Sequence, residues 1–453
     1  MHLQWPNKLD EASFLQQYWQ TRPLLIRQAF PELAASGNPI SRDELGGLAM
    51  ESDVTSRIIL RESDTQWHCS YGPFEQSELE ELPAQDWTLL VSDIEKHLPE
   101  LRNWIKPFHF IPQWRIDDLM ISYAPKGASV GAHTDNYDVF LLQAAGTREW
   151  SITENPEADR SLLPDLDIGV LANFEAENTW LLEPGDMLYL PPGIPHRGVS
   201  KDDDCMTWSI GFRAPSHREI VADIAERLAQ DIPEEAFYSD PGILLHEHSG
   251  QISPNVVTRI REIWNSYVLP DNEQFEELVG HLLTRANGSD EPFDAPPPVR
   301  AEQGDVSADD LQNAQSEARV QLQARLDAEG SWERDSFANL AFVPQSRLAE
   351  SEENPPAKML KKIKATVSRS NNLDETLADD DDLNHTLQVA DKKALDVKLY
   401  VNGQAIECSE SLATTLTGEF HYSATDLIES CTDFQDCNAL QWLIDNGMLQ
   451  PVS

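Results

Sequence analysis

The feature that most constrains the fold is a series of short β-rich runs between about residues 114 and 215. The runs are separated by turn residues and read LMISYA, DVFLLQA, REWSIT, TWLLE, MLYLP and MTWSIGF. Several short strands with turn residues between them are typical of a β-sandwich or β-barrel. We therefore predict a barrel here, preceded by a segment that mixes helical and strand patterns.

A histidine and an acid two positions apart, His133 and Asp135, lie within this region. Residues i and i+2 of a strand point to the same face, so both side chains are expected to face the barrel interior. Two imidazoles and one carboxylate are the ligands by which non-haem Fe(II) oxygenases hold their metal. The pair alone is weak support, because 12 histidines in so acidic a chain give on the order of two such matches by chance.

The stronger signal is the pattern Gly185-x5-Pro191-x-Gly193-x2-His196. Its first glycine is expected to turn the chain into a strand, and its proline and second glycine to end that strand tightly. The histidine then lies where the next strand begins. The alternative is that the histidines are merely hydrogen-bonded members of the core. We predict that iron is held by three residues: His133, Asp135 and His196.

An oxygenase of this type also needs a cation at depth in the barrel. One end of 2-oxoglutarate chelates the iron, and the other carboxylate must be received by a positively charged group. Arg148 lies in the strand after Asp135, and Ser122 lies on the strand before His133. We predict that 2-oxoglutarate binds to Arg148 and Ser122. The alternative is that Arg148 lies on the surface and forms an ion pair with Glu149.

The same alternation indicates which side chains share the pocket with the metal. If Ser122 faces inward, so do Met120 and Asp118. If Asp135 does, so does Tyr137. An acid, an aromatic ring and a flexible thioether suit a cationic side chain with an alkyl stem, such as arginine. Asp118 could equally be a structural cap at the barrel rim. The predicted substrate pocket is formed by Asp118, Met120, Tyr137 and Ser209.

Residues 216–288 change to helical spacing. Wide apolar faces on three helices need a surface to pack against, and a second subunit is one candidate. An ordinary helical layer on the barrel is the other. The apolar stripes are Ile220, Ile224 and Leu228, then Val256, Ile260, Ile263, Trp264 and Tyr267, then Phe275, Leu278, Val279 and Leu282.

The C-terminal part follows a proline-rich linker at residues 292–298. Its stretch 344–395 contains no Phe, Trp or Tyr and is expected to be a flexible insertion. Residues 397–453 look folded again, as a small α+β unit such as a winged helix. Lys398 is the only lysine or arginine in that unit, so the charge that contacts phosphates is missing and direct nucleic-acid binding is not expected.

The formal net charge of −44 repels nucleic acid and accelerates encounter with basic partners, although it can also serve solubility or adaptation to salt. The 5 cysteines contain no C-x-x-C pair, which argues against a disulfide framework and a structural zinc site. No segment has the pattern of a signal peptide or the length of a membrane span. We therefore expect a cytoplasmic protein without a membrane partner.

Four segments resemble a known family: WRIDDLMIS (114–122), HTDNYDVFLLQ (133–143), LEPGDMLYLPPGIPH (182–196) and SIGFRAP (209–215). They are similar to the bacterial JmjC-type ribosomal oxygenases, the arginine hydroxylases of large-subunit ribosomal protein sixteen. The similarity covers most of 1–343 and 397–453.

The resemblance implies an α+β protein with three parts. These are a double-stranded β-helix (cupin/JmjC) catalytic domain over 1–215, a helical dimerisation region over 216–291, and a winged-helix-like domain over 292–453 with the insertion at 344–395. It also implies Fe(II), 2-oxoglutarate and O2 as cofactor and co-substrates, and hydroxylation of the β-carbon of an arginine in a ribosomal protein. By position, iron falls on His133, Asp135 and His196, 2-oxoglutarate on Ser122 and Arg148, and the substrate on Asp118, Met120, Tyr137 and Ser209.

Two alternatives stay open. The first is a JmjC oxygenase that acts on histidine or methyl-lysine of another protein. The second is a non-catalytic cupin-like ribosome assembly factor that binds a basic protein through its acidic surface.

Overall fold

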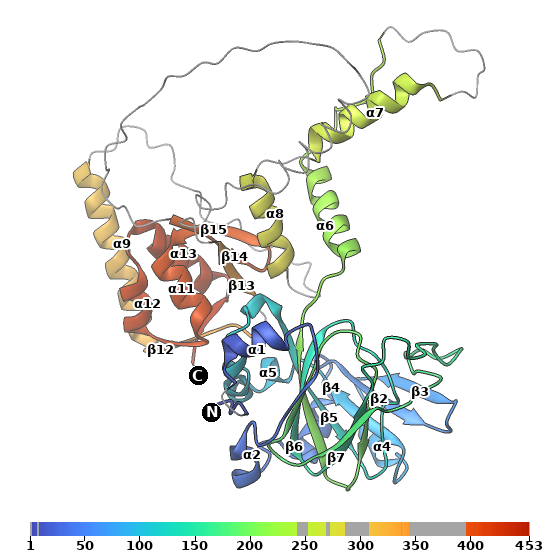
Figure 1. Ribbon diagram of the computed structural model, residues 1–453. Coiled ribbons are helices and arrows are strands. Elements are labelled where there is room, and N and C mark those ends of the chain that lie inside the picture. The colour runs from blue at the N-terminus through green and yellow to red at the C-terminus, as the bar shows by residue number, and fades with distance from the viewer. Residues whose placement is uncertain are drawn as a thin grey trace. The chain divides into compact units, whose positions relative to one another are not determined.

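The computed structural model describes residues 2–6, 9–241, 252–268, 272–285, 308–336, 338–343 and 396–452. The chain divides into two compact units, Met1–Ala222 and Asp223–Ser453 (Figure 1). The insertion predicted at 344–395 lies outside the described residues. Among the helices that are described, none has the length and apolar character needed to span a bilayer.

The first unit begins with short helices and strands. Capping signals in the sequence explain where helices start: Asp10 accepts a hydrogen bond from the Ser13 amide, and Ser41 forms a capping box with Glu44. The elements are α1 (Glu11–Gln17), β1 (Leu24–Ile26), α2 (Pro31–Ser36), α3 (Arg42–Leu48), β2 (Ser56–Arg61), β3 (Trp67–Tyr71), α4 (Gln76–Glu80), β4 (Trp87–Val91), α5 (Ile94–His97) and the 3-10 turns Pro99–Trp104, Lys106–Phe108 and Gln113–Arg115.

The predicted barrel is confirmed as two antiparallel sheets. An 8-stranded sheet has the order β1-β9-β6-β11-β5-β4-β2-β3, and a 3-stranded sheet has the order β10-β7-β8. Strands from the N-terminal segment therefore extend the barrel rather than forming a separate layer. The remaining strands are β5 (Ile116–Ala124), β6 (Asp138–Ala145), β7 (Arg148–Ile152), β8 (Asn178–Leu182), β9 (Met187–Leu190), β10 (His196–Ser200) and β11 (Cys205–Phe212).

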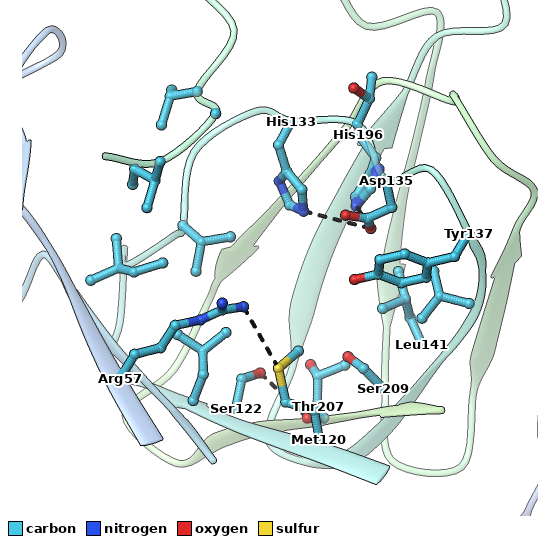
Figure 2. Close-up of a pocket in the computed structure, with 18 of the residues that line it drawn as sticks. Arg57, Met120, Ser122, His133, Asp135, Tyr137, Leu141, His196, Thr207 and Ser209 are labelled. Atoms are coloured by element: carbon cyan, nitrogen blue, oxygen red, sulfur yellow. Dashed lines mark hydrogen bonds and ion pairs between the residues drawn. The ribbon is translucent and has the colours of Figure 1, made fainter. Parts of the chain in front are cut away.

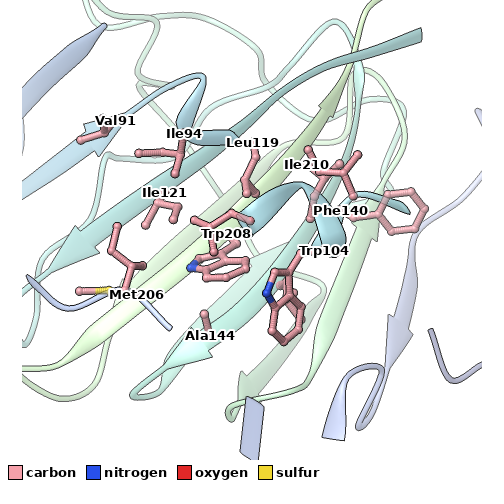
Figure 3. Close-up of a cluster of buried hydrophobic side chains, with 14 of the residues drawn as sticks. Val91, Ile94, Trp104, Leu119, Ile121, Phe140, Ala144, Met206, Trp208 and Ile210 are labelled. Carbon is pink, nitrogen blue, oxygen red and sulfur yellow. The ribbon is translucent and has the colours of Figure 1, made fainter. Parts of the chain in front are cut away.

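The alternation of side chains along the central strands separates core from cavity. On β11, Trp208 and Ile210 are buried in the main hydrophobic core, whereas Thr207 and Ser209 line a cavity on the other face. Trp104 packs edge-on against Trp208 with ring centroids 5.2 Å apart (Figure 3). Truncating one such buried aromatic residue costs about 3–5 kcal/mol, so this core holds the strands that carry the cavity.

The predicted helical spacing of residues 216–288 is confirmed by α6 (His217–Gln230), α7 (Pro254–Tyr267) and α8 (Asn272–Thr284). Ser253 caps α7, and Pro254 occupies its first turn. Neither α6 nor α7 contains a buried residue. On α7, the apolar residues Val257, Ile260 and Trp264 are exposed.

The C-terminal part packs its own core, which includes Leu326, Trp332, Leu399, Leu412 and Leu440. Two 3-stranded sheets, β16-β12-β17 and β13-β14-β15, lie among its helices. The elements are α9 (Ala308–Glu329), β12 (Ser331–Arg334), β13 (Leu340–Val343), β14 (Asp396–Val401), β15 (Gln404–Ser409), α11 (Glu410–Gly418), β16 (His421–Ser423), α12 (Ala424–Ser430), α13 (Phe434–Asp445) and β17 (Leu449–Pro451).

Candidate metal centre and its pocket

A cavity of about 340 Å³ opens in the barrel and is lined by residues of both sheets. Figure 2 shows two histidines and an aspartate converging on one side of it. The lining residues are Arg57, Ile59, Tyr71, Leu90, Met120, Ser122, Val130, His133, Thr134, Asp135, Tyr137, Val139, Leu141, Arg148, Trp150, Asp167, Ile168, Gly169, Val170, His196, Thr207 and Ser209.

The structure brings His133, Asp135 and His196 together, but not through the strand that we predicted for His133–Asp135. Only His133 is in β geometry, in an isolated bridge in which its amide and carbonyl pair with those of His196 at 3.0 and 2.9 Å. Asp135 lies in the irregular segment before β6. The expectation of a regular strand was wrong, because local alternation cannot show that backbone pairing stops after one residue.

Three donor atoms face one another at this point. Asp135 Oδ2 lies 3.5 Å from His196 Nε2 and 3.9 Å from His133 Nε2. One ligand atom from each residue lies within 4.8 Å of the others, so the three can hold a metal ion. Two imidazoles and one carboxylate are the donor set of non-haem Fe(II) sites, and this set fits that ion.

Hydrogen bonds orient both imidazoles toward the centre. His133 Nδ1–H donates to the Gly131 carbonyl at 3.1 Å, and His196 Nδ1–H donates to the Ile194 carbonyl at 2.9 Å. Because a carbonyl only accepts, each Nδ1 carries the proton and each Nε2 keeps its lone pair for a metal. Burial, followed by the charge of His133, holds the pKa of His196 well below its usual range. Burial raises the pKa of Asp135.

Arg148 lies at the start of β7 and is only 4% exposed. Its Nη1 points to the Ser122 hydroxyl at 3.5 Å, and its Nε donates to Cys205 Sγ at 3.3 Å. Its Nη2 is buried and has no hydrogen-bond partner among the described residues. A buried guanidinium with a free donor at a cavity wall fits a carboxylate, which accepts from two such N–H groups at once.

A glycine lies in the close-packed space beside this arginine. Gly198 of β10 pairs with Trp150 of β7, and a Cβ at Gly198 would lie 2.8 Å from the Trp150 ring and 3.0 Å from Arg148 Cδ. Any side chain at this position would therefore push against the arginine stem. The sequence pattern around His196 did not reveal this role, because it depends on the neighbouring strand.

The predicted substrate residues divide into two groups. Met120, Tyr137 and Ser209 line the cavity, but Asp118 is not among its lining residues. The register between β5 and β11 shifts between Ile210 and Phe212, so Asp117 and Asp118 face the single residue Gly211. This β-bulge interrupts the alternation from which we placed Asp118 beside Met120.

Asp118 nevertheless lies near the lining residue Tyr137, because its charge is among the causes that raise the pKa of that phenol. Its carboxylate accepts from the Asp93 amide and the Ser92 hydroxyl, and burial together with nearby Asp117 raises its pKa to about 7. Nearby, Glu95 accepts from the Leu119 amide at 3.0 Å, and burial, with a smaller contribution from Asp118, raises the pKa of Glu95 to about 8.

Several residues of the pocket wall, notably Arg57, Tyr71 and Asp167, were not predicted from the sequence. Arg57 points its guanidinium into the cavity, and its Nη2 lies 4.0 Å from Met120 Sδ (Figure 2). Arg57 and Ile59 are two positions apart on β2, and both line the cavity. That alternation was visible in the sequence, but the position of β2 in the barrel sheet was not.

Two family models match the chain. A JmjC domain matches residues 103–220, and an AraC-like ligand binding domain matches residues 174–290. The first match contains the three donor residues and Arg148. It therefore covers most of the cavity lining, but not Arg57, Ile59, Tyr71 and Leu90.

Curated relatives extend the similarity beyond this domain. The chain is 36% identical over 320 residues to the ribosomal protein uL16 3-hydroxylase of Escherichia coli, a match that covers 71% of this chain and 80% of the relative. It is also 36% identical over 230 residues to a probable ribosomal oxygenase of Haemophilus influenzae, covering 51% and 56%.

Solved structures agree with the sequence relatives. A crystal structure of E. coli YcfD matches with a TM-score of 0.69 at 27% identity and covers 99% of this chain and 100% of its own. The structure of the same ribosomal oxygenase in complex with cobalt and 2-oxoglutarate matches with a TM-score of 0.66 at 26% identity, covering 99% of each chain. The chain belongs to the family of JmjC-domain ribosomal oxygenases that includes the E. coli uL16 3-hydroxylase.

Proposed function

We propose that this protein is an Fe(II)- and 2-oxoglutarate-dependent oxygenase that hydroxylates the β-carbon of an arginine side chain in a large-subunit ribosomal protein. The observation that carries the proposal is one cavity with a three-residue donor set and a buried arginine that has a free donor. The E. coli relative is named as a 3-hydroxylase of ribosomal protein uL16. The same substrate class is therefore proposed for this chain.

His133, Asp135 and His196 would hold the iron, and Arg148 with Ser122 would receive the distal carboxylate of 2-oxoglutarate. Bound iron supplies the chemistry that reduces dioxygen at the expense of 2-oxoglutarate and replaces a substrate C–H with C–OH. The protein's part is to orient the groups. The two hydrogen bonds from Nδ1–H to backbone carbonyls hold both imidazoles in place. The buried guanidinium would set the orientation in which the co-substrate binds.

The outer part of the cavity would receive the substrate arginine. Tyr137 and Met120 offer a ring and a thioether to its alkyl stem, and Ser209 offers a hydroxyl. Asp118, near Tyr137, would bind its guanidinium, which requires the carboxylate to be ionised. The net charge of −44 would attract a basic ribosomal protein and disfavour nucleic acid as a direct partner. A ribosomal-protein substrate also implies that this protein acts in the cytoplasm.

Mass spectrometry of reaction products tests this function. The full-length protein is incubated with Fe(II), 2-oxoglutarate and ribosomal proteins, and any added oxygen is mapped to its residue. We expect one additional oxygen on an arginine of a large-subunit protein. Oxygen on histidine, or loss of methyl groups from lysine, would replace the arginine assignment by one of the other JmjC activities. No turnover with any basic protein would favour the scaffold alternative.

We further propose that residues 216–291 form a dimerisation region between a catalytic domain (1–215) and a winged-helix-like domain (292–453). The support is the exposed apolar stripe of Val257, Ile260 and Trp264 on α7, because a monomer seldom leaves such a stripe in water. Light scattering after size exclusion should give twice the chain mass, and Trp264→Glu should shift it toward the monomer. The matched control is Arg261→Glu, an exposed position on the same helix.

A further inference from the structure

The guanidinium of Arg148 is held from behind by a sulfur atom. Cys205, the first residue of β11, is completely buried, and its Sγ accepts from Arg148 Nε at 3.3 Å. Cys205 does not line the cavity, whereas Arg148 does. The cysteine therefore touches the arginine without access to a ligand in the cavity.

This contact decides which donors of the guanidinium remain free. The group is planar with five N–H donors in a fixed fork, so fixing the Nε–H direction also fixes where both Nη atoms point. With Nε on Cys205 and Nη1 near Ser122, the buried Nη2 is left without a partner among the described residues. The unpaired donors then belong to Nη2, the atom between the Nε–H that contacts the sulfur and the Nη1 that lies near Ser122.

The sulfur is itself part of a closed set of hydrogen bonds. Gln143 Nε2 approaches Cys205 Sγ at 3.5 Å and donates to the Ala145 carbonyl at 2.7 Å. Gln143 Oε1 accepts from the Thr207 hydroxyl at 3.0 Å, and the Thr207 carbonyl accepts from the Ser122 hydroxyl at 3.3 Å. Cys205 and Ser122, which contact opposite ends of the guanidinium, are thus tied to each other through β6 and β11.

We propose that Cys205 is a positioning residue for the co-substrate, because it holds Arg148 in the orientation in which its Nη atoms receive a carboxylate. This inference rests on the proposed function of the cavity. It assigns to a buried cysteine a role in the affinity for a dicarboxylic acid, without contact to that acid. An apolar side chain at position 205 would leave Nε–H buried without an acceptor and free the guanidinium to turn toward another one.

The test is the affinity of the full-length protein, loaded with cobalt(II), for 2-oxoglutarate, measured by titration calorimetry. Cys205→Ala removes the acceptor and should weaken binding about tenfold, equivalent to about 1.4 kcal/mol. Cys205→Ser keeps an acceptor and should stay within about threefold of the unmodified protein. Cys205→Val fills the space of the thiol without providing an acceptor and should weaken binding as much as the alanine variant. It keeps the test valid if the alanine variant does not fold.

The matched control is Cys408→Ala, another cysteine that is completely buried, in β15 of the second unit. It should leave the affinity for 2-oxoglutarate unchanged. In turnover assays, Cys205→Ala should raise KM for 2-oxoglutarate and leave both kcat and KM for the protein substrate nearly unchanged. A merely structural role would instead lower kcat through the active fraction.

Two results would overturn the inference. One is unchanged 2-oxoglutarate affinity in both Cys205→Ala and Cys205→Val, and the other is a serine variant as weak as they are. If the unmodified cobalt-loaded protein does not bind 2-oxoglutarate at all, both the proposed function and the role of Cys205 are refuted. Normal binding by the unmodified protein and by every Cys205 variant removes only the role of the cysteine.

Discussion

The two ends of the cavity are built differently. At the inner end, Arg148 and Ser122 line the cavity and Cys205 lies behind the arginine; all three are buried, and each is on a strand of one of the two sheets. At the outer end, Tyr71 is 65% exposed and Tyr137 is exposed in the segment before β6. A strand ladder holds a side chain to one direction, whereas an irregular segment such as that of Tyr137 can adjust to what binds. The inner end therefore suits a small co-substrate of constant shape, and the outer end suits a protein chain.

The largest expected effect comes from the donor set that both ends share. Asp135→Ala should reduce hydroxylation more than about a hundredfold, because even groups behind metal ligands are worth 10–100-fold. Calorimetric titration with cobalt(II) and mass mapping of the product measure the two losses. Intact hydroxylation in this variant would contradict the assignment of Asp135 as a ligand.

Arg148→Lys tests the inner end alone. Lysine keeps the charge but lacks the planar two-donor fork, so 2-oxoglutarate affinity should fall about ten- to a hundredfold. Affinity for the protein substrate should not change. Arg197→Lys, an exposed arginine on β10, is the control and should be neutral. Equal losses for both co-substrate and protein would show that the two ends are not independent.

Asp118→Asn tests the outer end. It should raise KM for the protein substrate about ten- to a hundredfold, since a hydrogen bond to a charged group is worth about 1.5–3 kcal/mol. The pKa of Asp118 is about 7, so its carboxylate is ionised above that pH and KM should fall as pH rises through 7. The asparagine variant should lose this dependence. Asp53→Asn, an exposed acid, should keep it. A KM that stays flat with pH in the unmodified protein would contradict the role of Asp118.

Gly198→Ala tests whether the inner end of the cavity is close-packed around Arg148. The added methyl group would press on Trp150 and on the stem of Arg148, and a few-fold rise in KM for 2-oxoglutarate should follow. Gly47→Ala is the control, because a Cβ there meets nothing within 4 Å. Unchanged KM would mean that the strands give way more easily than their packing indicates.

Glu95→Gln should have the smallest effect on activity and a distinct effect on stability. The pKa of Glu95 is raised from 4.5 to about 8, so the folded protein holds a proton that the unfolded chain releases. Stability therefore falls as pH rises between these values, and glutamine should remove part of that slope. Denaturant unfolding at pH 5.5 and 8 measures it. The part of the slope that comes from Asp118, whose pKa is also raised, should persist in this variant. A slope that does not change at all would show that Glu95 is ionised in the folded state.

Predictions that rested on short-range patterns agree best with the structure. The barrel strands and the placement of Met120 beside Ser122 on the cavity wall follow from period-two alternation within single strands. Arg148 and Ser209, which were chosen for their chemistry on neighbouring strands, also line the cavity. Asp118 departs from that pattern because the bulge opposite it depends on β11, a strand far away in the sequence. Arg57 was missed for a related reason: β2 reaches the cavity only through its pairing with β4, which in turn pairs with β5.

The amino-acid sequence was enough to show which donor atoms are available and near which turns they lie, because ligand chemistry and glycine–proline frames are local properties. Only the tertiary structure decided that His133 meets His196 through a single backbone bridge and that Cys205 lies behind Arg148. Both contacts join residues from different strands. Their geometry is set by how the strands pair and by the core beneath them, which no local pattern encodes.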